Sequence, residues 1–155
     1  MRKFYSFLLA TVALLCSTAA NAQFFTIDDV NYTVISSGEK TVAVTTGNWP
    51  AGTLTIPATV TYESVDYTVT EINDFAFQFC VDITGEVTLP ATIKSIGGGV
   101  FADCSNITAF NVAADNANYV SVNGVIYTKD MSTVVLCPNA KTGTYTIADG
   151  VTTIA

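Results

Sequence analysis

Runs of threonine, valine, isoleucine and tyrosine, separated by turn-forming residues, recur along most of the chain after residue 23. These residue types favour half-buried β-strands. Strands are expected at 41–46 and 133–136, and loops at 46–52 and 138–143. Helical periodicity extends no further than a turn around 74–80, so the sequence predicts a mainly β domain.

The strongest pattern is an internal repeat of 24 residues. Segment 69–83 aligns with segment 93–107 so that four apolar anchors coincide, two of them cysteine and phenylalanine. One such coincidence would carry little weight, whereas four at one spacing define a repeat. The anchor pairs are Ile72 and Ile96, Phe77 and Phe101, Cys80 and Cys104, and Ile83 and Ile107.

A second element accompanies each repeat. The run Thr55–Val60 resembles Thr88–Ile93, and Thr146–Val151 has a similar form without proline. The pattern of each unit therefore predicts a strand, a turn at proline, a short strand and a compact helical or 3-10 turn that contains the phenylalanine. A single unit cannot bury its apolar strip, so stacked units should form a solenoid with a parallel β ladder and like residues above one another.

Three hairpins are expected, because a turn-forming pair precedes Val-x-Tyr three times: at Asp28-Asp29, Glu63-Ser64 and Asn123-Gly124. The Asn-Gly pair suits a type I′ turn, which requires positive φ at both positions. We therefore divide the chain after residue 22 into a β region at 23–52, two repeats at 53–110, a hairpin insert at 111–143 and the start of an incomplete repeat at 144–155. Stacked repeats need a covered last face, so further repeats or a capping partner are expected after Ala155.

The first 22 residues have the pattern of a secretory signal peptide. Arg2 and Lys3 precede an apolar stretch at 4–20, and Ala20-Asn21-Ala22 is a small-x-small cleavage site. The apolar stretch is shorter than the ~20 residues of a transmembrane helix, and no other such segment follows. We expect an exported protein, secreted or held at the cell surface, that begins at Gln23.

The net charge argues against partners that carry phosphate groups. Residues 23–155 contain four lysines and thirteen carboxylates, so their formal net charge is 4 − 13 = −9. A surface of this sign repels phosphate groups, so nucleic acid and anionic membranes are not expected partners.

The chain offers little for catalysis or for binding of metals and cofactors, and none of these is expected. Histidine is absent, so the common nucleophilic triads and the usual zinc sites cannot form. Cys80 and Cys104 occupy equivalent repeat positions, which suits either a buried thiol ladder or a redox pair. Cys137, in the predicted hairpin, is expected to be in the core.

Exposed aromatic side chains are the better candidates for partner contact. Trp49 lies in the Asn48-Trp49-Pro50 loop, and Tyr62 and Tyr119 are further candidates among the tyrosines. Cross-strand packing is the competing explanation for the tyrosines.

The repeat itself resembles a known family. The pattern Leu89-Pro90, Ile93, Ile96, Phe101, Cys104, Ile107 is similar to the BspA-like leucine-rich repeats of bacterial surface proteins, and segment 122–138 resembles their hairpin inserts. The resemblance implies a curved, right-handed leucine-rich-repeat-type solenoid with parallel strands, and a role in adhesion or recognition. The Gly97-Gly98-Gly99 run departs from the usual Gly-Asp-aromatic turn.

The favoured hypothesis is therefore a secreted or surface-displayed interaction protein that binds a protein or a carbohydrate. Two alternatives remain open: a secreted hydrolase or its accessory module, and a structural spacer for a domain encoded downstream.

Overall fold

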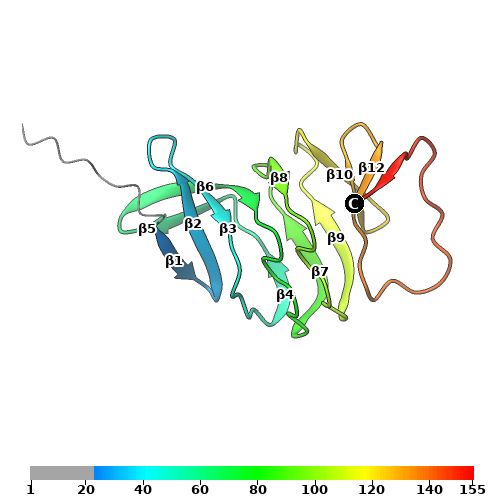
Figure 1. Cartoon of the computed structure of the whole chain (residues 1–155), viewed down its shortest axis with the longest axis horizontal. Coiled ribbons are helices and arrows are strands. Elements are labelled where there is room, and N and C mark those ends of the chain that lie inside the picture. Colours follow the sequence, from blue (N-terminus) through cyan, green and yellow to red (C-terminus); the bar gives the residue numbers. More distant parts are fainter. Residues whose placement is uncertain (1–22) are drawn as a thin grey trace, which may run out of the picture.

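The computed structural model describes residues 23–155, and every regular element in that range is a β-strand (Figure 1). The strands form a six-stranded, a four-stranded and a three-stranded sheet. The prediction of a β-rich leucine-rich-repeat-type solenoid is confirmed.

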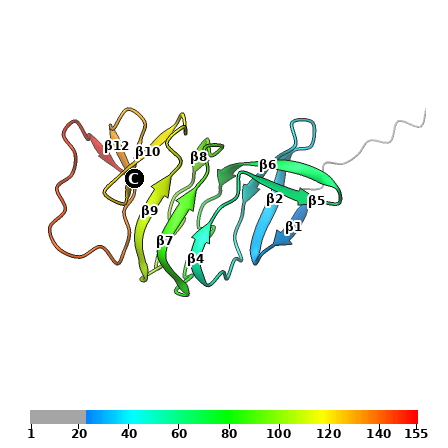
Figure 2. The same ribbon diagram turned by 180° about the vertical axis from the view of Figure 1, so that it is seen from behind.

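The solenoid is built from two columns of parallel strands. The chain passes alternately from one column to the other, so that each turn of the coil contributes one strand to each (Figures 1 and 2). Parallel pairing joins the neighbours in both columns. One column contains β4 (Gly52–Thr55), β7 (Ile83–Leu89) and β9 (Ile107–Val112), and the other contains β3 (Thr41–Val44), β6 (Val65–Ile72) and β8 (Ser95–Ile96).

An antiparallel region extends the second column at its N-terminal side. β1 (Phe24–Ile27) and β2 (Val30–Ser36) form a hairpin that pairs with β3, and β5 (Thr59–Tyr62) forms a hairpin with β6. Both hairpins have two-residue turns, and φ is positive at all four central residues. The two predicted hairpins are confirmed, and positive φ at both central residues is the conformation of a type I′ turn.

The C-terminal part forms the four-stranded sheet. Its strands are β10 (Tyr119–Val122), β11 (Val125–Thr128), β12 (Thr133–Leu136) and β13 (Thr153–Ile154). The turn between β10 and β11 is the predicted Asn123-Gly124 pair, again with positive φ at both residues. The buried Asn116 joins this sheet to the coil, because its Nδ2 donates to the carbonyl oxygen of Ile93 at 3.0 Å and its Oδ1 accepts the N–H of Tyr119 at 2.8 Å.

Matching apolar residues of successive turns lie in contact in the core. Ile72 pairs in register with Ile96, and the rings of Phe77 and Phe101 stack with centroids 5.1 Å apart and planes 3° from parallel. Ile83 and Ile107 are both buried, although a bulge places Gly85, and not Ile83, opposite Ile107. Burial of each such side chain stabilises the fold by roughly 1.5–3 kcal/mol.

Backbone hydrogen bonds join the turns as well as the strands. The N–H groups of Phe75, Phe77 and Phe79 donate to the carbonyl oxygens of Gly98, Val100 and Ala102 at 3.0, 2.9 and 2.9 Å. Every second N–H from Phe75 to Phe79 therefore bonds to the next turn of the coil, which fixes the two turns in register.

This pairing explains one departure from expectation. The compact turns were predicted as short helical or 3-10 segments, but within residues 23–155 they are series of non-helical turns. Gln78 and Cys80 bond locally, to the carbonyl oxygens of Phe75 and Phe77, while Phe77 and Phe79 bond outward to the next turn. Positive φ at Phe75 and Phe79 interrupts the helical backbone.

Replacement of Phe101 by alanine should lower the free energy of unfolding by about 3–5 kcal/mol. The side chain is buried and packs against Phe77 on one side and Phe110 on the other, each with centroids 5.1 Å away. Urea melts would measure the change, with Ile154→Ala on the exposed last strand as the control. A loss below about 0.5 kcal/mol would contradict the interior role of the ring.

Candidate binding surface

Three stacked turns form one side of the solenoid. They span residues 45–51, 73–82 and 97–106, and each connects a strand of the six-stranded sheet to a strand of the three-stranded sheet. We refer to the side formed by these three turns as the turn face. Its first turn is bonded to Asn31 of β2, through the side chain of Asn48 and the carbonyl oxygens of Thr46 and Gly47.

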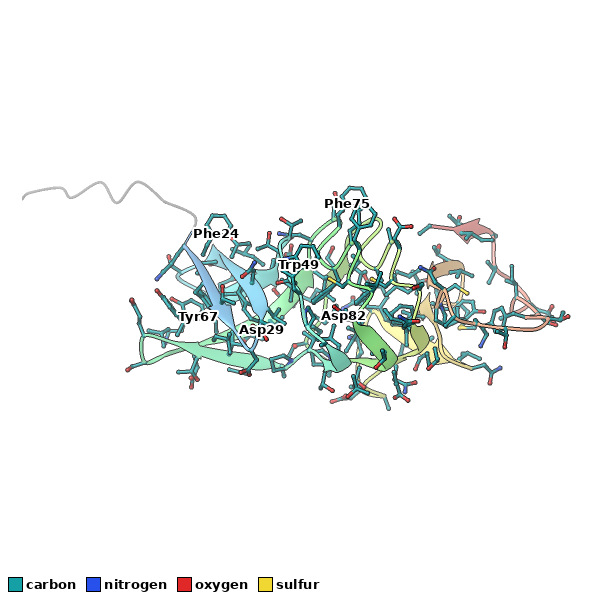
Figure 3. The ribbon with its side chains drawn as sticks, turned by 90° about the horizontal axis from the view of Figure 1, so that it is seen from below. Phe24, Asp29, Trp49, Tyr67, Phe75 and Asp82 are labelled. Atoms are coloured by element: carbon teal, nitrogen blue, oxygen red, sulfur yellow. The ribbon has the colours of Figure 1, made fainter. Side chains whose placement is uncertain are left out.

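The turn face carries a concentration of exposed apolar side chains. Trp49 is 71% exposed, Phe79 56% and Phe75 51%, and Val81 is also exposed. Figure 3 shows Phe75 standing out from the edge of the ribbon. Single exposed apolar residues are common on protein surfaces, but several on adjacent turns are typical of an interaction site.

Phe75 and Phe79 are also in an unfavourable backbone conformation, with φ of 56° and 64°. One repeat later, at the equivalent positions, φ is 59° and 62°, but the residues are Gly99 and Asp103. Glycine and aspartate tolerate this left-handed conformation, whereas bulky residues adopt it rarely. The next turn thus uses residues better suited to this backbone. The Phe75 ring lies against Gly99, where a Cβ would come within 2.6 Å of it, and about half of Phe75 remains exposed.

Asn48 holds the loop that carries Trp49. Its side chain is buried, donates from Nδ2 to the carbonyl oxygen of Ala76 at 2.8 Å, and accepts the N–H of Asn31 at Oδ1. The Cys80 thiol donates to the carbonyl oxygen of Asn48 at 3.0 Å. Trp49 is therefore presented by a fixed backbone next to turn 73–82, and little loop entropy would be lost on binding.

The turn face also carries carboxylates. Asp74, Asp82 and Asp103 are exposed on the turn face, and its three segments contain neither lysine nor arginine. A groove of about 300 Å³ runs along the edge of this face. Its polar lining includes Thr45, Thr46, Glu71, Asn73, Asp74 and Ser95.

The two repeat cysteines lie in the core beneath the turn face. Cys80 and Cys104 are free thiols, and Cys104 Sγ donates to the carbonyl oxygen of Phe77 at 3.0 Å, as Cys80 does to Asn48. Burial raises the pKa of Cys80 from 9.0 to about 11, and burial likewise raises the pKa of Cys104. Because the folded pKa of Cys80 is the higher one, its contribution to stability is complete below pH 9 and is lost as the pH rises to about 11.

Cys137 was expected in the core, and that prediction is wrong. It directly follows β12 and is exposed. The strand ends at Leu136, so the alternation that buries Val134 no longer applies to the loop that follows.

The predicted contact residues separate into two groups. Trp49 is on the turn face, whereas Tyr62 stacks on Phe25 with centroids 4.4 Å apart and the Tyr119 hydroxyl accepts the N–H of Ile96 at 3.2 Å. Both tyrosines thus pack within the protein. The sequence interpretation missed Phe75 and Phe79, although their alignment with Gly99 and Asp103 was available in the 24-residue repeat.

The part of the chain that the structure describes was also compared with the requirements of metal ligation and of a membrane-spanning helix. No three acidic or cysteine side chains converge as metal ligands within residues 23–155. The same range contains no helix of the length and hydropathy required to cross a membrane.

Comparison with protein families decides the classification. Residues 55–150 match the family described as "BspA type Leucine rich repeat region (6 copies)". The chain belongs to this BspA-type leucine-rich repeat family. The matched residues include both complete repeats, the hairpin insert and most of the turn face. None of the curated proteins matches the chain.

Solved structures share the fold. A leucine rich cell surface protein from Faecalibacterium prausnitzii is 22% identical, with a TM-score of 0.52, and the match covers 60% of this chain and 24% of that protein. A leucine-rich repeat protein from Bacteroides capillosus is 19% identical, with a TM-score of 0.52, over 84% of this chain and 96% of that one. A third, from Bacteroides ovatus, is 30% identical, with a TM-score of 0.49, over 59% and 24%. The chain thus spans about a quarter of the length of two of these relatives.

The double variant Phe75→Gly, Phe79→Asn should keep the free energy of unfolding within about 1 kcal/mol of the wild-type value. Relief of the left-handed strain, about 1–2 kcal/mol per residue, offsets the loss of two half-buried rings. Urea melts would test this, with the buried Phe77→Ala as a destabilised reference. A loss of stability above about 3 kcal/mol would show that the two rings stabilise the fold.

Thiol labelling should distinguish the three cysteines of residues 23–155. Iodoacetamide at pH 8 should modify Cys137 rapidly, and Cys80 and Cys104 only after unfolding, because these two are buried and protonated. Mass spectrometry of proteolytic fragments would assign the sites. Rapid labelling of Cys80 and Cys104 in the native protein would contradict the buried thiol ladder.

Proposed function

We propose that this BspA-type repeat protein is exported and works at the cell surface as an adhesion or recognition protein, without enzymatic activity. It binds a protein or carbohydrate partner through the turn face. The observation that carries the proposal is the pair of exposed phenylalanines kept at positive φ where the next turn has Gly99 and Asp103. Residues in strained backbone conformations concentrate at functional sites.

Two further observations support export and surface display. The first 22 residues have the three parts of a signal peptide. The protein of Faecalibacterium prausnitzii that shares the fold is described as a cell surface protein.

Geometry supports binding by the turn face. Aromatic rings provide large contact areas at low cost in side-chain entropy, and tryptophan is enriched among the residues that dominate binding energy. The backbone under Trp49 is fixed by the buried Asn48, and the backbone of turn 73–82 by its bonds to the next turn. The surface is therefore rigid before a partner arrives.

The test is adhesion of the purified protein to immobilised glycans and extracellular proteins. Wild type would be compared with Trp49→Ala and with the Phe75→Gly, Phe79→Asn variant, and Ile154→Ala would serve as a control that removes an exposed apolar side chain elsewhere. We expect the turn-face variants to bind at least about tenfold more weakly, and the control to bind like wild type.

Equal binding by all the variants would place the contact elsewhere. Turnover of a glycan or peptide that persists through repurification, and that these variants retain, would support a hydrolase instead.

A further inference from the structure

The turn face is both aromatic and anionic, and this combination restricts what it can bind. We propose that its partner is a protein segment rich in lysine or arginine, held by cation–π contacts and by carboxylates. This inference rests on the proposed function, since it names the partner class of the same surface.

The distribution of charge is the first reason. The three turns carry Asp74, Asp82 and Asp103 and no basic residue. Two of the four lysines of residues 23–155 lie in the C-terminal part with their ammonium groups bound: Lys129 Nζ donates to the carbonyl oxygen of Asn116 at 2.8 Å, and Lys141 Nζ to that of Asn123 at 2.7 Å. The other two, Lys40 and Lys94, are exposed but lie outside the three turns, so a partner can supply the positive charge that the turn face lacks.

The aromatic rings are the second reason. The faces of Trp49, Phe75 and Phe79 carry partial negative charge, and ammonium and guanidinium groups are attracted to them. The stems of lysine and arginine are apolar and cover such rings while the charged ends remain near water or a carboxylate. Asp74 is adjacent to Phe75, and its Oδ1 accepts the N–H of Gly98 at 2.7 Å, so this carboxylate is fixed beside the ring.

The groove beside Phe75 provides a place for the charged end of a lysine or arginine side chain of the partner. It holds about 300 Å³ between the first three turns of the coil, and Glu71 and Asp74 contribute carboxylates to its wall. The hydroxyl groups of Thr45, Thr46 and Ser95 add hydrogen-bond acceptors. A neutral oligosaccharide could stack on the rings but would gain no net attraction from these charges.

The single tryptophan makes the proposal directly measurable. Trp49 is the only tryptophan in the chain, so intrinsic tryptophan fluorescence reports on the turn face alone. The probes are a short peptide of alternating lysine and leucine, the same peptide with glutamate in place of lysine, and maltohexaose. We expect the lysine peptide to change Trp49 fluorescence saturably, with an affinity that falls as salt is raised to about 0.3 M.

Matched variants separate a site from general attraction to an acidic protein. The triple variant Asp74→Asn, Asp82→Asn, Asp103→Asn should bind the lysine peptide about tenfold more weakly, or weaker still. The control variant Glu39→Gln, Glu63→Gln, Asp149→Asn removes the same charge from exposed positions outside the turn face. It should weaken binding of the lysine peptide much less. The double variant Phe75→Gly, Phe79→Asn should also weaken peptide binding, while its urea melt stays close to that of the wild type.

The outcomes distinguish this inference from the proposed function. Three results would overturn the proposal of a cationic partner and leave the turn face as a binding surface. They are equal effects of the two triple variants, equal binding of the glutamate peptide, and a response to maltohexaose alone. If no probe changes Trp49 fluorescence and the turn-face variants adhere like wild type, both proposals fail.

Discussion

The structure depends on the contact between one turn of the coil and the next. Within a turn the chain has a single apolar strip, and only the neighbouring turn can cover it. The Phe77 and Phe101 rings stack in the interior, while the backbone of turn 73–82 donates three hydrogen bonds to turn 97–106. Apolar contact supplies the stabilisation, and the hydrogen bonds set the register.

The same contact determines what the surface can offer. Because alternate N–H groups of turn 73–82 point to the next turn, its backbone cannot follow a helix and adopts positive φ at Phe75 and Phe79. The Phe75 ring lies against Gly99 of the next turn, and both phenylalanines remain about half exposed. The inner residues of the turn hold the core together, while the exposed ones form a surface that a partner can contact.

Much of this fold could be predicted from the sequence, because it follows from short-range patterns. The 24-residue spacing identified the parallel coil, and three turn pairs identified the hairpins, with a type I′ turn expected at Asn123-Gly124. The roles of Asn48 and Asn116 could not be predicted, since each side chain bonds to backbone atoms more than twenty residues away. Burial of Tyr62 and Tyr119 likewise depends on partners brought together only by folding.

The candidate surface was only partly predictable. Trp49 was identified from its loop, whereas Phe75 and Phe79 were passed over because aromatic residues in a repeat suggest a core. Their exposure follows from backbone conformation, which the aligned Gly99 and Asp103 indicate in retrospect.

Amide hydrogen exchange followed by NMR tests the stacking of turns most directly. The N–H groups of Phe77 and Phe79 should be protected to nearly the same degree as that of Val87 in the central strand β7, because all of them open only when the coil unfolds. Exchange of Phe77 and Phe79 at the rate of an unstructured peptide, while Val87 stays protected, would contradict the account.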